Sequence, residues 1–199
     1  MPSTTARLFF ALWPDEAMQV ALAAAVAASV REAGPGSRAV PAENFHLTLA
    51  FLGAVPLRRF EALCQVAAQF AQGFDAGELP LAVTLDTVEY WRKPQILCAT
   101  ASETPPVAIT LAERLQATLT AQGFAPDLKP FRVHVTLARK VRRVTPELQH
   151  IEPVRWSFRD LHLVESRTEP AGAAGAAHAA AHASIYSTVE KWVLDKRDR

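Results

Sequence analysis

Two five-residue segments of this 199-residue chain repeat one arrangement of side chains able to do acid–base chemistry. They read His46-Leu47-Thr48-Leu49-Ala50 and His134-Val135-Thr136-Leu137-Ala138, so each places a threonine two positions after a histidine. Alternate side chains of a β-strand point to the same face, which puts each imidazole and its hydroxyl together, roughly 7 Å apart. The same alternation predicts Ala50 and Ala138 on the imidazole face and Phe51 on the buried face.

These residue types suit the cleavage of a phosphate ester. In-line attack on a phosphodiester needs a base beside the attacking water and an acid beside the leaving oxygen, and histidine, with an ordinary pKa of about 6.5, can serve as either. The hydroxyls of Thr48 and Thr136 would donate to the phosphate oxygens and hold the phosphorus between the two imidazoles. No cluster of carboxylates with metal-ligand spacing accompanies the histidines in the sequence, so we expect no metal and no other cofactor.

A structural role is the alternative for a single histidine–threonine pair on a strand. Two near-identical copies are harder to explain by packing. A duplicated packing motif would keep the apolar positions of both segments, such as Leu49 and Leu137, but has no need to keep the histidine and the threonine in both copies. We therefore interpret the two segments as parts of one catalytic site.

The predicted secondary structure follows one order twice: strand, helix, strand. Phe9 precedes His46 by 37 positions, Leu97 precedes His134 by 37, and the two histidines are 88 positions apart. This recurrence indicates a duplicated unit. The first copy is predicted over residues 7–12, 14–32 and 45–52 and the second over 95–100, 105–122 and 132–139, with a further helix over 57–72 and further strands over 79–90, 156–166 and 184–194.

Helices that alternate with hairpin-compatible strands favour an α+β fold over a doubly wound parallel sheet. We expect residues 1–199 to form a single bilobal domain, in which two pseudo-symmetric lobes bring the two histidine strands to one groove. Residues 169–183, EPAGAAGAAHAAAHA, are of low complexity and are predicted as a loop inserted between the last two strands.

Charge and hydropathy limit the partners of the chain. The formal net charge is only +1, so bulk electrostatics would not hold the protein on nucleic acid, and an anionic ligand needs a local basic cluster. The first apolar run, residues 8–13, is too short for a signal peptide, and no run is long enough to span a bilayer. We therefore expect a cytoplasmic protein with no membrane partner and no obligate protein partner.

Three segments carry a resemblance to a known family: residues 7–12 (RLFFAL), 41–53 (PAENFHLTLAFLG) and 131–139 (FRVHVTLAR). With these segments the chain resembles the 2H phosphoesterase superfamily and, within it, the RNA 2′,3′-cyclic phosphodiesterases, also known as 2′-5′ RNA ligases. The resemblance implies two lobes of antiparallel sheet with outer helices around a central groove. It also implies metal-independent hydrolysis of RNA-terminal 2′,3′-cyclic phosphates to 2′-phosphates, with 2′-5′ ligation as the reverse reaction.

The resemblance further implies how the work is divided. His46 would be the proton donor to the departing 3′ oxygen and His134 the proton acceptor that activates water; the residues alone do not order these roles. The family pattern also places Arg139 near the phosphate. Arg139 follows His134 by five positions, so a regular strand turns it away from the imidazole and a bulge turns it back, and both placements stay open.

The expected ligands are RNA with 2′,3′-cyclic phosphate ends or small cyclic nucleotides. Phe10 and Phe131 adjoin the histidine strands and are predicted to contact a base, and Arg132 is predicted to contact the RNA. Two other functions stay open: a 2H phosphodiesterase acting on 2′-5′ oligonucleotides or on a small cyclic nucleotide phosphate, and a non-catalytic RNA-binding module. Binding alone does not explain two intact histidines, because arginine or lysine would serve it equally well.

Overall fold

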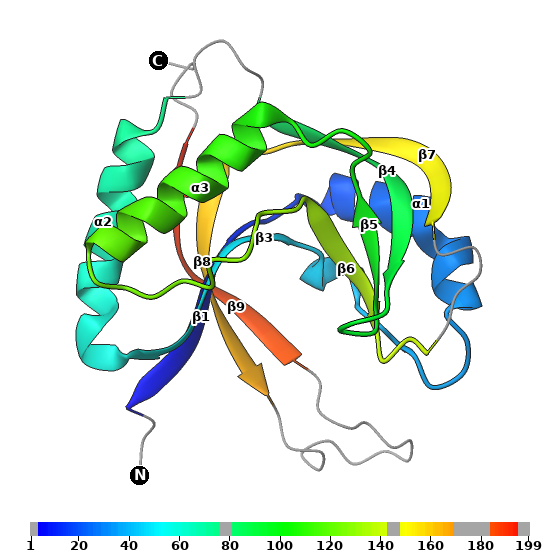
Figure 1. The fold of residues 1–199 in the computed structure, drawn as a ribbon, viewed down its shortest axis with the longest axis horizontal. Helices are drawn as coiled ribbons and strands as arrows, with labels where there is room; N and C mark the ends of the chain where they lie inside the picture. The colour runs from blue at the N-terminus through cyan, green and yellow to red at the C-terminus, as the bar shows by residue number, and fades with distance from the viewer. Residues whose placement is uncertain (1–3, 76–80, 143–147, 169–183, 195–199) are drawn as a thin grey trace.

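The computed structural model describes residues 4–75, 81–142, 148–168 and 184–194 (Figure 1). Its helices and strands bear out the predicted α+β class. In chain order they are β1 (Thr5–Leu12), α1 (Glu16–Glu32), β2 (Arg38–Ala39), the 3₁₀ turn η1 (Ala42–Asn44), β3 (Leu47–Pro56), the 3₁₀ turn η2 (Leu57–Arg59), α2 (Phe60–Gly73), β4 (Ala82–Trp91), β5 (Ile96–Thr100), α3 (Pro106–Ala121), β6 (His134–Arg139), β7 (Leu148–Ser157), β8 (Asp160–Thr168) and β9 (Ser184–Val193).

The strands form one antiparallel sheet in the order β7-β4-β5-β6-β3-β1-β8-β9, with β2 paired to β6. We call the strands β6, β5, β4 and β7 the β6 half and the strands β3, β1, β8 and β9 the β3 half. The two halves meet where β3 pairs with β6, through Leu47 opposite Val135. The two histidine strands are therefore the two central strands of the sheet.

Helices α1 and α3 each pack against the half of the sheet that does not contain the strand preceding them. Helix α1 follows β1, which belongs to the β3 half, but packs against β7 and β6 of the other half. Helix α3 follows β5, which belongs to the β6 half, but packs against β3 and α2, while α2 packs against β9 (Figure 1). Each strand–helix–strand unit thus contributes a helix to the opposite half, and the two units share one apolar core.

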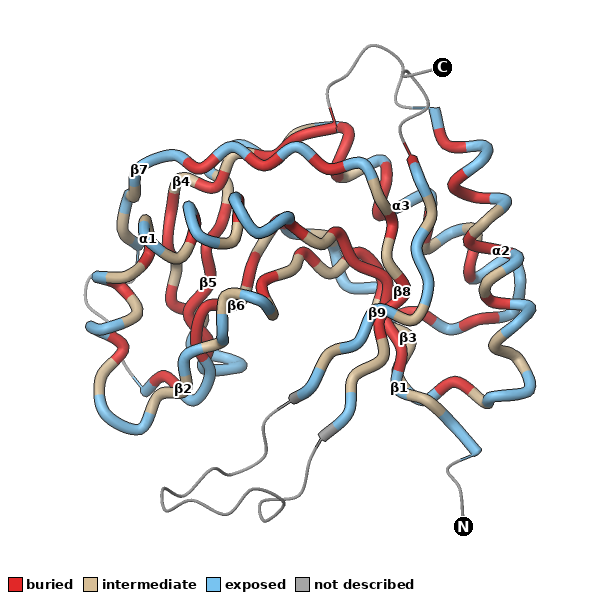
Figure 2. The backbone as a smooth tube through the Cα atoms, turned by 180° about the vertical axis from the view of Figure 1, so that it is seen from behind, coloured by how far each residue is buried: buried red, intermediate tan, exposed pale blue. Residues whose placement is uncertain are grey.

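Local sequence explains where the helices begin and which face they bury. The side chain of Asp15 accepts a hydrogen bond of 2.8 Å from the backbone N–H of Met18, which caps α1 at its first turn. Leu22 and Val26, four residues apart, then lie on the buried face of that helix. Leu111 and Leu115 do the same in α3. Figure 2 shows how buried stretches follow the sheet and the inner faces of the helices.

The structure corrects one predicted strand. The strand expected over residues 156–166 is two strands, β7 and β8, which end and begin on either side of Phe158 and Arg159. β7 lies at the edge of the sheet, so much of its length faces solvent, and it carries Pro153, which an edge strand tolerates. The short strand β2 was also not predicted. β2 has two residues, too few to show an alternating pattern, and in β7 buried and exposed residues alternate clearly only after Pro153.

The predicted loop over residues 169–183 lies outside the described residues. In the described part of the chain, no helix combines the length and the apolar character needed to cross a membrane.

Candidate active site

The register between β3 and β6 arranges the two histidines and two threonines. Leu47 and Val135 stand opposite one another and are fully buried in the core. The residues that flank them point to the other face, and in an antiparallel pair His46 then faces Thr136 and Thr48 faces His134. Facing Cβ atoms lie roughly 5 Å apart and the diagonal pair of histidines roughly 7 to 8 Å apart. Each imidazole therefore has the hydroxyl of the other copy as its neighbour across the strands.

Both imidazoles are held in the same way, by a backbone carbonyl two residues earlier in the chain. Nδ1 of His46 lies 2.7 Å from the carbonyl oxygen of Asn44, and Nδ1 of His134 lies 2.8 Å from the carbonyl oxygen of Arg132. A carbonyl oxygen only accepts, so Nδ1 carries the proton and donates in both rings. Nε2 of each neutral ring is left with a lone pair for proton transfer.

Burial and neighbouring positive charge favour the neutral form of both rings. Removal from water, with smaller contributions from the charges of Arg139 and His134, lowers the pKa of His46 to about 4, although the carbonyl of Asn44 opposes the shift. Burial, with the charges of Arg132 and Arg139, also lowers the pKa of His134. Both rings are therefore suited to accept a proton in the free protein, and the one that acts as an acid must first gain a proton.

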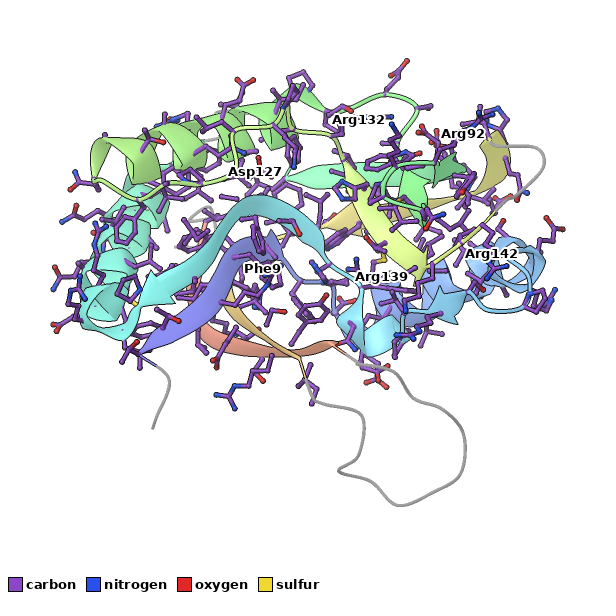
Figure 3. The ribbon with its side chains drawn as sticks, turned by 60° about the horizontal axis from the view of Figure 1, so that its bottom comes forward. Phe9, Arg92, Asp127, Arg132, Arg139 and Arg142 are labelled. Atoms are coloured by element: carbon purple, nitrogen blue, oxygen red, sulfur yellow. The ribbon has the colours of Figure 1, made fainter. Side chains whose placement is uncertain are left out.

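Arg139 reaches this face because of a β-bulge. Thr136 pairs with Cys98 and Ala138 pairs with Leu97, so Leu137 is the extra residue of β6. One extra residue reverses the alternation of the strand beyond it. Nη2 of Arg139 donates to the hydroxyl of Tyr186 at 3.3 Å, and the charge of Arg139 acts on both imidazoles. Figure 3 labels Arg139 at the end of β6. Of the two placements left open by the sequence, the structure has the one beside the histidines.

The first copy contains the same bulge. Thr48 pairs with Ala11 and Ala50 pairs with Phe10, so Leu49 is the extra residue of β3. Two placements predicted for the first copy are therefore wrong: Ala50 lies in the core, and Phe51 lies on the imidazole face, beside Phe9. Ala138 of the second copy is likewise in the core. A bulge has no signature in the alternation of apolar residues. Strict alternation therefore assigns the residues after Leu49 and Leu137 to the wrong face in both copies.

Aromatic rings surround His46. The indole of Trp13 stacks on the imidazole with centroids 5.1 Å apart, Phe9 lies 5.1 Å away, and Tyr186 presents its edge at 5.0 Å. His134 has one such neighbour among the described residues, Trp91, at 4.8 Å. These rings account for much of the burial of the two histidines.

Two of the three predicted RNA contacts lie apart from these rings. The base contact predicted for Phe10 is wrong, because Phe10 alternates with Phe9 and is fully buried in the core against Trp192. Phe131 is partly buried and packs on the same core. Arg132 is exposed, lies over the ring of Trp91 at 4.7 Å, and forms a 3.0 Å ion pair with Glu89.

Sequence reasoning passed over Trp13, Phe9, Phe51, Tyr186 and Glu89. Phe9 could have been found, because it alternates with a residue assigned to the wrong face, and Trp13 directly follows the first strand. Tyr186 reaches His46 only through the pairing of β9 with β8 and of β8 with β1, which no local pattern encodes. Glu89 accepts hydrogen bonds from Trp91, Thr100 and Arg132, and these donors are also brought together by pairing.

No group of three or more histidine, cysteine, aspartate or glutamate side chains is placed to hold a metal ion within the described residues.

Comparison with known proteins identifies the family. Residues 12–97 and 100–174 match the family model described as LigT-like phosphoesterase. The chain belongs to the LigT-like phosphoesterases. The resemblance inferred from the two histidine segments is therefore confirmed at the level of the family.

Curated LigT-like relatives have one name in common. The chain is 33% identical over 135 residues to the RNA 2′,3′-cyclic phosphodiesterase of Escherichia coli K12, an alignment that covers 67% of this chain and 71% of the relative. It is 34% identical over 104 residues to the enzyme of that name from Geobacillus stearothermophilus, covering 52% of this chain and 32% of the relative.

Solved structures of other proteins share the fold. Escherichia coli LigT complexed with 3′-AMP matches with a TM-score of 0.72 at 23% identity, covering 96% of this chain and 98% of that one. A protein of Thermus thermophilus matches with a TM-score of 0.72 at 26% identity, covering 94% and 97%. The bilobal fold expected from the sequence is thus borne out.

Proposed function

We propose that the protein hydrolyses 2′,3′-cyclic phosphodiesters at RNA ends to 2′-phosphomonoesters, using His46 and His134 as acid and base. One observation carries the proposal: the register of β3 and β6 sets two histidines and two threonines face to face, with both Nδ1 atoms held by backbone carbonyls. Two relatives named RNA 2′,3′-cyclic phosphodiesterase support the substrate class. An RNA substrate is met in the cytoplasm, where we predict the enzyme to act.

In the proposed reaction the phosphate lies between the two Nε2 atoms. Nε2 of His134 takes a proton from water as the water oxygen attacks phosphorus, and the bond from phosphorus to the 3′ oxygen breaks on the opposite side. His46, protonated in the complex, gives its proton to that 3′ oxygen, which leaves the phosphate on the 2′ oxygen. The family resemblance assigns the two roles, and exchange of protons with solvent resets both rings.

The negative charge of the substrate phosphate is proposed to raise the pKa of His46, which allows His46 to act as the acid. The pKa of His46 is about 4 in the free protein because of burial and nearby positive charge. A negative phosphate beside the ring stabilises the imidazolium and raises that pKa. His46 therefore becomes an acid when the substrate enters, and stays neutral when it does not.

Three side chains are proposed to hold the phosphate oxygens. The hydroxyls of Thr48 and Thr136 flank the imidazoles from the facing strands and can donate to non-bridging oxygens. The guanidinium of Arg139, anchored on Tyr186, would offset the charge that grows on those oxygens during attack. We propose the terminal base to stack on the exposed parts of Trp13 and Tyr186 rather than on Phe10.

The decisive experiment is an assay in EDTA with an RNA oligonucleotide that ends in a 2′,3′-cyclic phosphate, with the position of the product phosphate determined. We expect a 2′-phosphate from the wild-type protein. His46→Ala and His134→Ala should each lower kcat roughly 10²- to 10⁴-fold. Arg155→Ala, an exposed side chain on the edge strand β7, is the control and should keep full activity. Full activity in both histidine variants, or a 3′-phosphate product, contradicts the proposal.

The alternatives left open by the sequence are separated by the same protein preparations. A preference for a 2′-5′ oligonucleotide or a small cyclic nucleotide phosphate would appear as a higher kcat/KM on that substrate than on the RNA end. A non-catalytic RNA-binding module would bind these ligands and turn over none of them.

A further inference from the structure

A row of aromatic rings leads away from His46 on the imidazole face of the β3 half and ends in an arginine. The ring of Phe9 lies 5.1 Å from that of His46, and the ring of Phe51 lies 6.5 Å from that of Phe9, measured between centroids. The guanidinium of Arg7 lies over Phe51, 4.7 Å from the ring centroid. We call Phe9, Phe51 and Arg7 the β3-side row. The proposed hydrolysis uses neither Phe51 nor Arg7.

Strand alternation and a β-bulge bring these three side chains to one face. Arg7 and Phe9, the latter labelled in Figure 3, are two residues apart on β1. This strand alternates regularly, because both bulges in its pairing with β3 belong to β3. Phe51 stands opposite Phe9 and reaches the same face through the bulge at Leu49. The row therefore follows from the register of two neighbouring strands, and it runs along β1 toward the first residues of that strand.

The β3-side row becomes more exposed with distance from His46. Phe9 is 3% exposed, Phe51 is partly buried and Arg7 is exposed. Arg7 pairs with Ala54, an exposed residue with a small side chain. The apolar cluster around Phe9 takes its members from strands and from the residue that follows β1, and none comes from a described helix: Phe9, Ala11 and Val164, with Trp13, Phe51 and Tyr186 packed against them. A ligand held by the histidines can therefore extend over this face to Arg7.

The positive charge of Arg7 is open to an anion. None of the ion pairs formed between described residues includes Arg7. Two carboxylates beside the row are paired with other cations: Asp127, whose backbone is hydrogen-bonded to β3, pairs with Lys129 at 2.7 Å, and Glu165 of β8 pairs with Arg167 at 2.7 Å. A guanidinium stacked on an aromatic ring still donates hydrogen bonds from its edge, so Arg7 is held in place with its donors free for a ligand.

The proposed reaction determines on which side of the phosphate the RNA lies. His46 gives its proton to the 3′ oxygen, so the ribose that carries this oxygen lies on the His46 side of the phosphorus, next to the β3 half. The strand on the 5′ side continues from that ribose. Two residues of a β-strand span about 6.8 Å, similar to the spacing of consecutive phosphates in an extended strand. The β3-side row therefore leads in the direction that the RNA must take.

We propose that Arg7, held on the ring of Phe51, binds a backbone phosphate on the 5′ side of the terminal nucleoside. Arg7 is then a specificity-determining residue, through which the enzyme prefers an RNA end to a mononucleotide. The inference rests on the proposed function, because that function puts the ribose on the His46 side. Two N–H groups of a guanidinium can donate to one phosphate. Arg7 does not touch the reacting atoms, so its contact is the same before and during the reaction and acts on KM rather than on kcat.

The test compares two substrates in one set of proteins. Adenosine 2′,3′-cyclic phosphate has no phosphate on its 5′ side, whereas a triadenylate that ends in a 2′,3′-cyclic phosphate has two. The wild-type protein should prefer the triadenylate. In Arg7→Gln we expect kcat/KM for the triadenylate to fall roughly tenfold, through KM, while kcat/KM for the mononucleotide changes by less than about twofold. Arg114→Gln is the matched control and should change neither value, because Arg114 is an exposed arginine over another phenylalanine, Phe74, at 5.4 Å on α3.

Several results overturn the role of Arg7 and leave the hydrolytic function standing. They are a wild-type protein with no preference for the triadenylate, equal loss on both substrates in Arg7→Gln, and the same loss in Arg7→Gln and Arg114→Gln. If the wild-type protein turns over neither substrate, the proposed function fails, and Arg7 is judged by binding alone. The Kd of a triadenylate with a terminal 2′-phosphate is then measured at several salt concentrations. The slope of log Kd against log salt should fall by about 0.7 in Arg7→Gln, the value for one phosphate contact on a single strand, and an unchanged slope overturns the site.

Discussion

The indole of Trp13 stacks on the imidazole of His46 with ring centroids 5.1 Å apart and an angle of 7° between the planes. An aromatic face at this distance excludes water from one side of the imidazole. Because burial is the main cause of the lowered pKa of His46, this stacking makes the acid–base behaviour of the site depend on a residue that does not itself titrate.

Replacing the indole should bring water to the ring. In Trp13→Leu we expect the pKa of His46 to rise from about 4 toward its ordinary value of 6.5, because desolvation of the imidazolium is relieved. NMR titration of the His46 ring protons measures this directly. Trp13→Phe keeps an aromatic face and should retain most of the lowering. A pKa that stays near 4 in Trp13→Leu would show that other neighbours desolvate the ring.

An anion in the site should raise the same pKa in the intact protein. Titration of the wild-type protein with adenosine 2′-phosphate, the expected type of product, should move the pKa of His46 upward from about 4. Arg139→Gln removes a repelling charge and is expected to raise the pKa in the free protein. An unchanged pKa with bound nucleotide would contradict the assignment of His46 as the acid.

The lowered pKa also makes stability depend on pH. The unfolded chain has a histidine pKa near 6.5 and the folded chain has about 4 at His46, so the unfolded state binds the proton more readily. The contribution of His46 is fully present above pH 6.5 and is lost as the pH falls toward 4, on the order of 3 kcal/mol. Urea unfolding of the wild-type protein and His46→Asn at several pH values measures it. The wild-type free energy of unfolding should fall more steeply between pH 6.5 and 4, and parallel curves would contradict this.

Glu89 is a positioning residue for the His134 side. Its carboxylate accepts from the indole of Trp91 at 2.8 Å and from Arg132 at 3.0 Å, and the carbonyl of Arg132 holds Nδ1 of His134. Glu89→Gln replaces one acceptor oxygen with a donor, which opposes these two donors. We expect kcat to fall roughly tenfold because a small misplacement of the catalytic ring is costly. Stability should change by less than about 1 kcal/mol, since the Arg132 side chain is exposed.

NMR signals of the His134 ring distinguish a positioning role of Glu89 from a role in folding. Its NMR signals should broaden or shift in Glu89→Gln while those of His46 stay in place, and thermal unfolding should be nearly unchanged. A loss of activity that follows loss of folded protein would instead mean that Glu89 is structural.

Arg139 and Tyr186 are expected to act as one unit. Arg139→Lys keeps the charge but loses the planar fork that suits a phosphate, so kcat/KM should fall roughly tenfold. Tyr186→Phe removes the hydroxyl that anchors Nη2 at 3.3 Å and should cost roughly twofold to threefold. The effects on kcat/KM should be less than additive in the double variant, because both changes break the same contact. Fully additive losses would show that the two residues work independently.

Much of the site could be predicted from the sequence. The alternation that puts His46 with Thr48 and His134 with Thr136 is a property of neighbouring residues, since successive side chains of a regular strand point to opposite faces. The order of strands and helices around the two segments is likewise local. The predicted elements were found, except that the strand expected over residues 156–166 is the two strands β7 and β8 and that the short strand β2 was not predicted. The internal repeat followed from counting positions along the chain.

Only the tertiary structure decided which further side chains join the two histidines. The bulges at Leu49 and Leu137 are set by pairing with β1 and β5, and each reverses the face of the residues after it. The rings of Trp13 and Tyr186 meet at His46 through strands distant in sequence. Residue types and their spacing along one strand determine what chemistry a pair of side chains can do. The register between strands determines which other side chains surround them. Register arises from contacts among residues far apart in the chain, so it cannot be read from the local sequence.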